Sequence, residues 1–567
     1  MCLHRLKHLI KIYVLPDMSL LQLPDACLVA VLRCCADDPR SVCSAGRAHS
    51  RLRKAAVEAL SSITATVKQR EQLDSLLMHL AAHGQHIDSI SLGGVSMDEP
   101  VFLHRLPPSL LGLSSLTLSN LALRLHPRRG IGQWNIGYYQ GVLGAAVTPP
   151  LKQLWLHSCT LLDKGAELAA ALALLPGLEH LSIMMCFQGR YLDVYDDDSD
   201  DERGPLHISL GEVLPGLQHL TYLELGGVCI GARDDGSSKY RTKSTYRGTT
   251  GMIAFGTAEM QHLSALTRLV DLRLLGLECS FTLTASMLSA AHGLTCLQLK
   301  TEDWYHDVRF QPSALTGKTL LQHLELRECS MDVAQLLHEL HLLQQLTRLR
   351  LGYISVRWTD PQEPPPAAAY SALTASSKLQ HLDIEEFPVP VGVWEHMFPT
   401  SRQLPQLQVL GIANVEHAEL VSATAPEGTR LVSCCPGLQS LNLIGLHYGR
   451  GLLTALQGLS SLTKLYVDAY DSSAELHHVC QLTGLQWLQL YEEEHYEGHG
   501  MLLQLTQLRQ LTYLNYSGHV DNLPCAKVFQ IQVGVLCFCL MMCMSPQSRM
   551  YLVSSASNVV WLLQLGG

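Results

Sequence analysis

Several features that define other classes of protein are scarce in this chain of 567 residues. Charged residues make up only 16% and aromatic residues 6%. Basic residues (41 Lys and Arg) do not outnumber acidic ones (51 Asp and Glu), and the net charge is −10. Because nucleic-acid binding requires a basic face, we expect no nucleic-acid partner.

The sequence also lacks patterns that hold metals or phosphates. Its 18 cysteines form no pair of C-x-x-C units at zinc-ribbon spacing, so we expect reduced thiols and no metal site. Gly130 and Gly132 are followed by the bulky Trp134, no phosphate-binding loop occurs, and the pair His477 and His478 has no third ligand at metal spacing. The sequence therefore predicts no enzyme, no catalytic residue and no cofactor.

Long apolar runs are missing as well. The basic stretch 1–17 has no core of signal-peptide length, and we interpret it as an extension before Met18. The apolar tail, residues 528–567, has a clean run of only twelve residues, Val533–Met544. As a helix this run would span about 18 Å, less than the ~30 Å core of a bilayer. We expect a tail or cap, no membrane partner, and a cytoplasmic or nuclear protein; the alternative location is the cytoskeleton or ciliary axoneme.

What the chain does contain is a repeat, L-x-x-L-x-L. It begins with Ile87, Ile90 and Leu92, returns as Leu113, Leu116 and Leu118, and continues to Leu511 in about 15 units, many of them spaced by 23–28 residues. In x-L-x-L the leucines alternate with period two, so each unit predicts a short strand with one buried face. Segments such as 161–175 and 331–343 have apolar residues at helical spacing and would return the chain to the next strand.

This pattern resembles that of leucine-rich-repeat proteins. An apolar residue stands eight positions after the first leucine, as at Cys159, Cys186 and Cys329, and elsewhere at Val95, Leu121, Ile354 and Phe387. This feature resembles the cysteine-containing subclass, in which a small apolar side chain fills the layer beneath the turn. The resemblance implies an α/β solenoid, a horseshoe with a parallel β-sheet on its concave face, over residues 64–527. Loop insertions are expected near 125–150, 193–205, 231–251 and 360–369.

A short helical module, residues 18–63, precedes the repeats. Pro24 and Asp25 suit a first helical turn, and Leu28, Val31 and Leu32 share one helix face. The module resembles an F-box, which docks onto the adaptor subunit of SCF-type ubiquitin ligases. The resemblance implies an adaptor-binding surface that consists of Leu23, Pro24, Asp25, Leu28, Val31, Leu32 and Leu52. The alternative is a helical cap that covers the first repeat.

The residues between the strand leucines should form the partner-binding face. Aromatic and arginine side chains contribute most to binding energy at protein interfaces. At these positions stand Trp155, Tyr222, Arg273, Arg327, Arg348, Arg350, Tyr466, Trp487 and Tyr491. The three arginines 327, 348 and 350 could together bind an acidic or phosphorylated segment. We therefore expect a non-enzymatic substrate receptor of an SCF-like ubiquitin ligase, with a protein target on the concave face; the alternative is a structural scaffold of the cytoskeleton or cilium axoneme.

Overall fold

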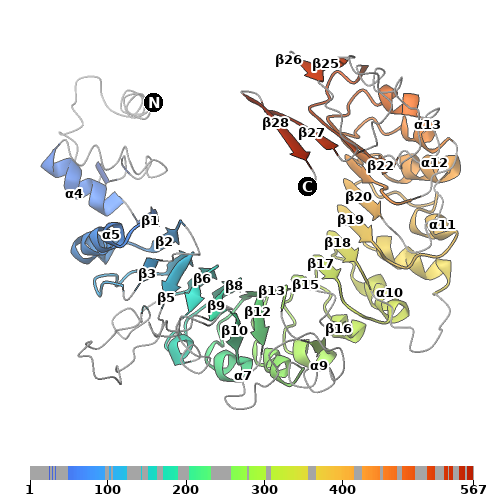
Figure 1. Ribbon diagram of the computed structural model, residues 1–567. Helices are drawn as coiled ribbons and strands as arrows, with labels where there is room; N and C mark the ends of the chain where they lie inside the picture. Colours follow the sequence, from blue (N-terminus) through green and yellow to red (C-terminus); the bar gives the residue numbers. More distant parts are fainter. Residues whose placement is uncertain are drawn as a thin grey trace, which may run out of the picture. The chain divides into compact units, whose positions relative to one another are not determined.

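A computed structural model describes residues 25, 28–29, 32, 49–59, 61–95, 101–103, 106–123, 142, 151–161, 170–188, 204–230, 257–277, 280–301, 308–354, 365–413, 424–446, 451–468, 476–491, 507–517, 529–533, 536–540, 548–555 and 558–565. The chain forms two compact units, residues 1–281 (unit 1) and 282–567 (unit 2). Each is described by itself below and can be followed by its labels in Figure 1.

Unit 1 is built on one parallel sheet. Its strands follow each other in chain order: β1 (Ser62–Val67), β2 (Ser89–Gly94), β4 (Ser115–Ser119), β6 (Gln153–His157), β8 (His180–Met184), β11 (Tyr222–Gly226) and β13 (Asp271–Leu275). Helices α4 (Ser50–Ala59) and α5 (Arg70–His83) flank the first strand, and α5 ends in the short η2 (Gly84–His86).

A second, narrower sheet of unit 1 follows the turns. It contains β3 (Val101–Leu103), β5 (Leu121–Leu123), β7 (Thr160–Leu161), β9 (Phe187–Gln188), β10 (Gly204–Ile208) and β12 (Val228–Ile230). These strands pair in parallel except for β9 with β10, which pair antiparallel. Among the described residues, the return segments include the short helices α7 (Leu210–Val213), η3 (Leu214–Gly216) and η4 (Gln261–Ala265).

Unit 2 continues the same design. Its parallel strands are β15 (Cys296–Lys300), β17 (His323–Arg327), β18 (Arg348–Gly352), β19 (His381–Glu385), β20 (Val409–Ala413), β21 (Ser440–Asn442), β22 (Lys464–Asp468), β23 (Trp487–Tyr491) and β24 (Tyr513–Ser517). The strands β27 (Ser548–Ser555) and β28 (Asn558–Leu565) then extend the sheet antiparallel, and β25 (Phe529–Val533) and β26 (Leu536–Leu540) form a separate hairpin.

Helices return the chain between the strands of unit 2. They are α9 (Ala285–Leu288), η5 (Pro312–Leu315), α10 (Val333–Leu342), η6 (Ala367–Thr374), α11 (Val393–Met397), α12 (Ala425–Cys434), α13 (Leu452–Leu456) and η8 (Leu476–Gln481). The short strand β14 (Phe281–Leu283) lies where the two units join in the sequence, and β16 (Val308–Phe310) belongs to unit 2.

The predicted alternation explains why these segments are strands. The repeat leucines, such as Leu116 and Leu118 of β4, are fully buried, while the residues between them are half-exposed. The predicted return segment 331–343 contains α10, whose amino-terminal Asp332 accepts a hydrogen bond from the backbone of Gln335 at 3.0 Å. Within each unit the strands lie along the inner side of an arc and the helices along its outer side (Figure 1). The α/β leucine-rich-repeat solenoid expected from the sequence is the observed fold.

Among the described residues, a left-handed residue directly follows each of eight strands. It is Asn120, Ser158, Met185, Glu328, Tyr353 or Glu386, with φ between 44° and 55°, or a glycine, Gly227 or Gly276. Its N–H donates to a carbonyl of the next strand, as from Tyr353 to Glu385 at 2.8 Å. The turn directs the following residue into the core, which explains why Cys159, Cys186 and Cys329 are buried at the predicted position.

At one of the predicted positions the side chain is not buried. Val95 was expected to be buried, but it is 56% exposed. Strand β2 runs straight on through Gly94, because this residue still pairs with Val67 of β1. The described backbone at this strand end therefore has no left-handed residue to turn Val95 inward.

The structure also locates the expected segment boundaries. The first strand starts at Ser62, two residues before the predicted start of the solenoid. The stretches 125–141, 143–150, 193–203, 231–251 and 360–364 of the predicted insertions lie outside the described residues. Gly204 already begins β10, and Ala367 begins η6, so the ends of two predicted loops are regular structure. The tail, where described, is four strands.

Candidate binding surface

The strand register arranges the outward side chains of unit 2 into three rows. The first, third and fifth residues of a five-residue strand point away from the core, and each lies beside its counterpart on the next strand. On β15 the three rows start with Cys296, Gln298 and Lys300. From β17 onwards the first row comprises His323, Arg348, His381, Val409, Ser440, Lys464, Trp487 and Tyr513. The second row contains Glu325, Arg350 and Asp383, and the third contains Arg327 and Glu385. We call the outward side of the parallel strands, in either unit, the strand face.

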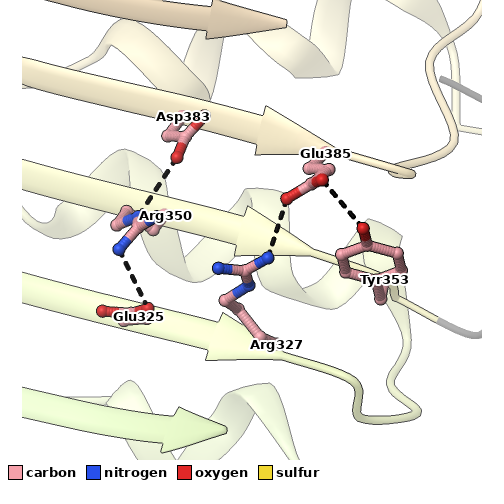
Figure 2. Close-up of polar contacts among 6 residues, drawn as sticks. All are labelled: Glu325, Arg327, Arg350, Tyr353, Asp383 and Glu385. Carbon is pink, nitrogen blue, oxygen red and sulfur yellow. Dashed lines mark hydrogen bonds and ion pairs between the residues drawn. The ribbon is translucent and has the colours of Figure 1, made fainter. Parts of the chain in front are cut away.

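Arg350 joins three strands in the second row (Figure 2). Its Nη1 lies 3.3 Å from Oε1 of Glu325 on β17, and its Nε lies 3.1 Å from Oδ2 of Asp383 on β19. All three side chains are 15–27% exposed. Because both carboxylates are largely shielded from water, the guanidinium between them compensates charges that would otherwise be costly to bury.

A second ion pair lies beside it in the third row (Figure 2). Nη2 of Arg327 is 2.7 Å from Oε2 of Glu385, and the hydroxyl of Tyr353 donates to the other carboxylate oxygen at 2.8 Å. The guanidinium of Arg327 also lies 5.5 Å from the centre of the Tyr353 ring. The hydrogen bond to Glu385, together with partial burial, raises the pKa of Tyr353 to about 12.

The three arginines predicted to act together are therefore not equivalent. Arg327 and Arg350 are paired with carboxylates of the chain itself, whereas Arg348 has no ion pair with any described residue. Arg348 lies beside His381 in the register of β18 and β19. Burial, and then the positive charge of Arg348, lower the pKa of His381 to about 4.

An aromatic stack ends the first row. The rings of Trp487 on β23 and Tyr513 on β24 lie nearly parallel with their centres 3.5 Å apart. Nζ of Lys464 lies 5.8 Å from the centre of the Trp487 ring. Tyr466, also predicted for this face, is half-buried in the second row. Tyr491 is the last residue of β23, and its side chain lies outside what the structure describes.

Unit 1 has an aromatic cluster of its own. The ring of Tyr222 on β11 lies 5.2 Å from that of Trp155 on β6 and stacks on that of His180 on β8 at 5.7 Å. The guanidinium of Arg273 lies 5.1 Å from the Tyr222 ring and forms two 3.0 Å hydrogen bonds to Asp271. Three predicted residues, Trp155, Tyr222 and Arg273, are thus brought together by adjacent strands.

Some residues of these clusters were not predicted. His180, Glu385 and Tyr353 take part in the contacts above, although the sequence analysis did not single them out. His180 and Glu385 are the first and last residues of their strands, so the alternation itself could have identified them. Tyr353 lies in the left-handed turn and carries no such signal.

Of the four described residues that were predicted to bind an adaptor, three are buried. Leu28, Leu32 and Leu52 are 0%, 1% and 8% exposed. Asp25 is exposed and forms an ion pair with Arg51 of α4 at 2.6 Å. Leu23, Pro24 and Val31 lie outside the described residues. The polar edge formed by Asp25 and Arg51 is therefore an accessible part of this module.

In the part of the chain that the structure describes, no helix combines the length and apolarity needed to cross a membrane. No group of three or more His, Cys, Asp or Glu side chains is arranged there to hold a metal ion.

Comparison with known proteins gives similarity at the level of structure alone. No family model and no curated protein matches the sequence. An internalin from Listeria monocytogenes is 14% identical with a TM-score of 0.38, and the match covers 74% of this chain and 93% of that one. The leucine-rich-repeat ectodomain of the Arabidopsis receptor kinase HAESA, solved with a peptide hormone ligand, is also 14% identical with a TM-score of 0.38; the match covers 81% of this chain and 69% of the other.

Proposed function

We propose that the chain is a non-enzymatic protein-binding solenoid and the substrate receptor of an SCF-type ubiquitin ligase. Support for the binding role comes from the strand face, where Trp155, Tyr222, Trp487 and Tyr513 gather into two aromatic clusters. Large aromatic side chains that remain half-exposed are typical of interface hot spots. In this proposal the target binds the strand face, and other subunits of the ligase supply the catalyst.

The adaptor role is assigned to the amino-terminal module, on its resemblance to an F-box. Its leucines 28, 32 and 52 are buried, so they hold the module together. The exposed ion pair of Asp25 and Arg51 is then the polar edge available to an adaptor. The burial of the leucines equally suits the second candidate, a scaffold protein of the cytoskeleton or cilium axoneme whose amino-terminal helices only cap the repeats.

A pull-down of the SCF adaptor by the full chain separates these two functions. Substituting Leu28 or Leu32 would disturb the fold, so the informative variant is Asp25→Lys, which reverses one charge of an exposed ion pair. We expect it to weaken adaptor binding about tenfold, the loss typical of one charge-assisted contact. Its matched control is Asp74→Lys, which reverses the acid of another exposed pair, with Arg70 of α5. If the unmodified chain does not bind the adaptor, the ligase role is wrong and the scaffold remains.

Target binding by the strand face is tested separately. A photo-reactive amino acid placed at Tyr222 or at Tyr513 should crosslink the target in cells. The same amino acid at Leu342, which is 51% exposed on α10, is the control for the opposite side of the repeat. Crosslinks from Leu342 alone would contradict binding at the strand face.

A further inference from the structure

The first row of unit 2 contains cations and N–H donors but no carboxylate. From β17 to β24 it presents His323, Arg348, His381, Val409, Ser440, Lys464, Trp487 and Tyr513. The acids that lie nearby, Glu325, Asp383 and Glu385, stand in the other two rows and are each bound to Arg327 or Arg350. The positive charge of the first row is therefore not balanced by any carboxylate within that row.

Donors of this row also lack hydrogen-bond partners. Among the described residues, Nε of Arg348 and Nε1 of Trp487 are shielded from solvent and bonded to no acceptor, and the shielded Nε2 of His381 likewise has no hydrogen-bond partner. Most shielded donors in folded proteins have an acceptor, so several without one along a single row are unusual. Lys464 forms no ion pair with a described residue; its Nζ lies 5.8 Å from the centre of the Trp487 ring. The first row therefore contains no negatively charged hydrogen-bond acceptor.

The spacing of the two cations sets the length of a matching ligand. Arg348 on β18 and Lys464 on β22 are separated by four strand-to-strand steps. At ~4.8 Å per step their backbones lie about 19 Å apart. An extended chain covers ~3.3 Å per residue, so about six residues bridge this distance. The intervening Val409 and Ser440 are uncharged and half-buried, and the Trp487–Tyr513 stack follows within the next two strands.

We propose that the first row of unit 2 binds an extended acidic segment of a partner protein, with two carboxylates about six residues apart on Arg348 and Lys464 and an apolar side chain beyond them against the Trp487–Tyr513 stack. This inference rests on the proposed function, since it specifies the target. The segment crosses the strands and contacts neither Arg327 nor Arg350. Carboxylates match the row better than phosphates, because Arg348 and Lys464 each offer a single positive charge, which balances one carboxylate but only half the charge of a phosphate dianion.

Synthetic peptides test the proposal with the full chain. The probe is a fluorescein-labelled nine-residue peptide with Glu at positions 1 and 7, Phe at position 9, and Gly and Ser elsewhere. Its matched control has the same composition with Glu at positions 1 and 2. We expect fluorescence anisotropy to show at least about fivefold tighter binding of the spaced peptide, since only this peptide can occupy both cations at once.

Variants assign the binding to the first row. Arg348→Gln and Lys464→Gln should each weaken binding of the spaced peptide about tenfold, the loss expected for one charge-assisted contact. Lys300→Gln, which removes the same charge from the last position of β15, should change the affinity less than about twofold. Arg348→Lys should restore part of the binding, and circular dichroism would verify that each variant is folded.

Four outcomes would overturn the proposal. Equal binding of the spaced and control peptides, or an equal loss with Lys300→Gln, would mean that only the overall charge matters. Tighter binding of a peptide with phosphoserine in place of both Glu residues would mean that the ligand is a phosphopeptide. If no peptide binds while Tyr222 or Tyr513 still crosslinks a target, the acidic segment is wrong and the protein-binding function stands.

Discussion

At the scale of single residues, the arginines of unit 2 divide into two roles. Arg350 neutralises Glu325 and Asp383 at once, while Arg348, one row away on the same strand, has no ion pair among the described residues. Side chains of one type on one strand can thus stabilise the fold or remain available to a ligand, depending on which neighbours the register gives them.

This difference predicts opposite effects on stability. Arg350→Gln leaves two largely shielded carboxylates side by side, so the free energy of unfolding should fall by about 1–2 kcal/mol. Arg348→Gln removes a cation with an unsatisfied Nε, and the free energy of unfolding should change by less than about 0.5 kcal/mol or rise slightly. Urea denaturation of both variants measures this. Equal losses would contradict the assigned roles.

His381 predicts a dependence of stability on pH. Burial and the nearby Arg348 and Arg350 lower its pKa to about 4, while Asp383 acts in the opposite direction. In the unfolded chain the pKa returns to about 6.5, so between these values the unfolded state binds more protons. Stability therefore falls as the pH drops from about 6.5 to about 4, and His381 makes no contribution above this window.

The variant His381→Gln isolates that contribution. The difference in the free energy of unfolding between this variant and the unmodified chain should be about 1–2 kcal/mol more in favour of the variant at pH 4.5 than at pH 7.5. This figure is smaller than the full pKa shift implies, because the imidazole is partly exposed. Chemical denaturation at the two pH values provides the comparison. The same difference at both pH values would show that His381 is not shielded in the folded state.

At the scale of elements, the left-handed turn after a strand places several residues other than glycine in a backbone conformation that glycine adopts more easily. Met185 adopts φ 50° although its side chain is 53% exposed and has little packing to offset the strain. Its counterpart on the next strand is Gly227, at φ 59°. Side chains with a Cβ atom adopt this conformation at a cost of about 1–2 kcal/mol, and glycine does not.

Exchanging these residue types should therefore have opposite effects. Met185→Gly should raise the free energy of unfolding by about 1 kcal/mol, and Gly227→Ala should lower it by about the same amount. Thermal unfolding followed by circular dichroism measures both. A loss of stability in Met185→Gly would show that the contacts of this side chain outweigh the backbone strain.

At the scale of the whole molecule, the repeats and the rows of outward side chains could be predicted from the sequence, because the same alternating pattern determines which side chains are buried in every repeat. The pairing of Arg350 with Glu325 and Asp383 could not, since it depends on the register between strands that are 25 and 33 residues apart in the chain. The prediction that Val95 is buried was wrong for a related reason. Strand β2 has a sixth residue, Gly94, that still pairs with β1 where the turn was expected. The alternating pattern determines on which face of the sheet a side chain lies, and the register between strands determines which side chains lie beside it.

Burial of cysteines throughout the described chain gives a test of the fold as a whole. The side chains of Cys159, Cys186, Cys296, Cys329, Cys434, Cys435 and Cys480 are buried. Burial raises the pKa of the Cys435 thiol to about 12 and that of the Cys329 thiol above its usual range, so these two thiols remain protonated at neutral pH. Iodoacetamide should leave these seven unlabelled in the native protein and label them in urea, as read by peptide mass spectrometry. Labelling of Cys329 in the native state would contradict the predicted layer beneath the turn.

The strand register has a consequence for engineering. Trp155 pairs with Thr117 although 38 residues separate them, and Arg350 pairs with Glu325 across only 25; both stand in the same position of their strands. The length of a return segment thus leaves the alignment of the rows unchanged. A single repeat should therefore be replaceable by another of different length. The side chains of a binding face could then be changed one strand at a time, while the register of the neighbouring strands stays the same.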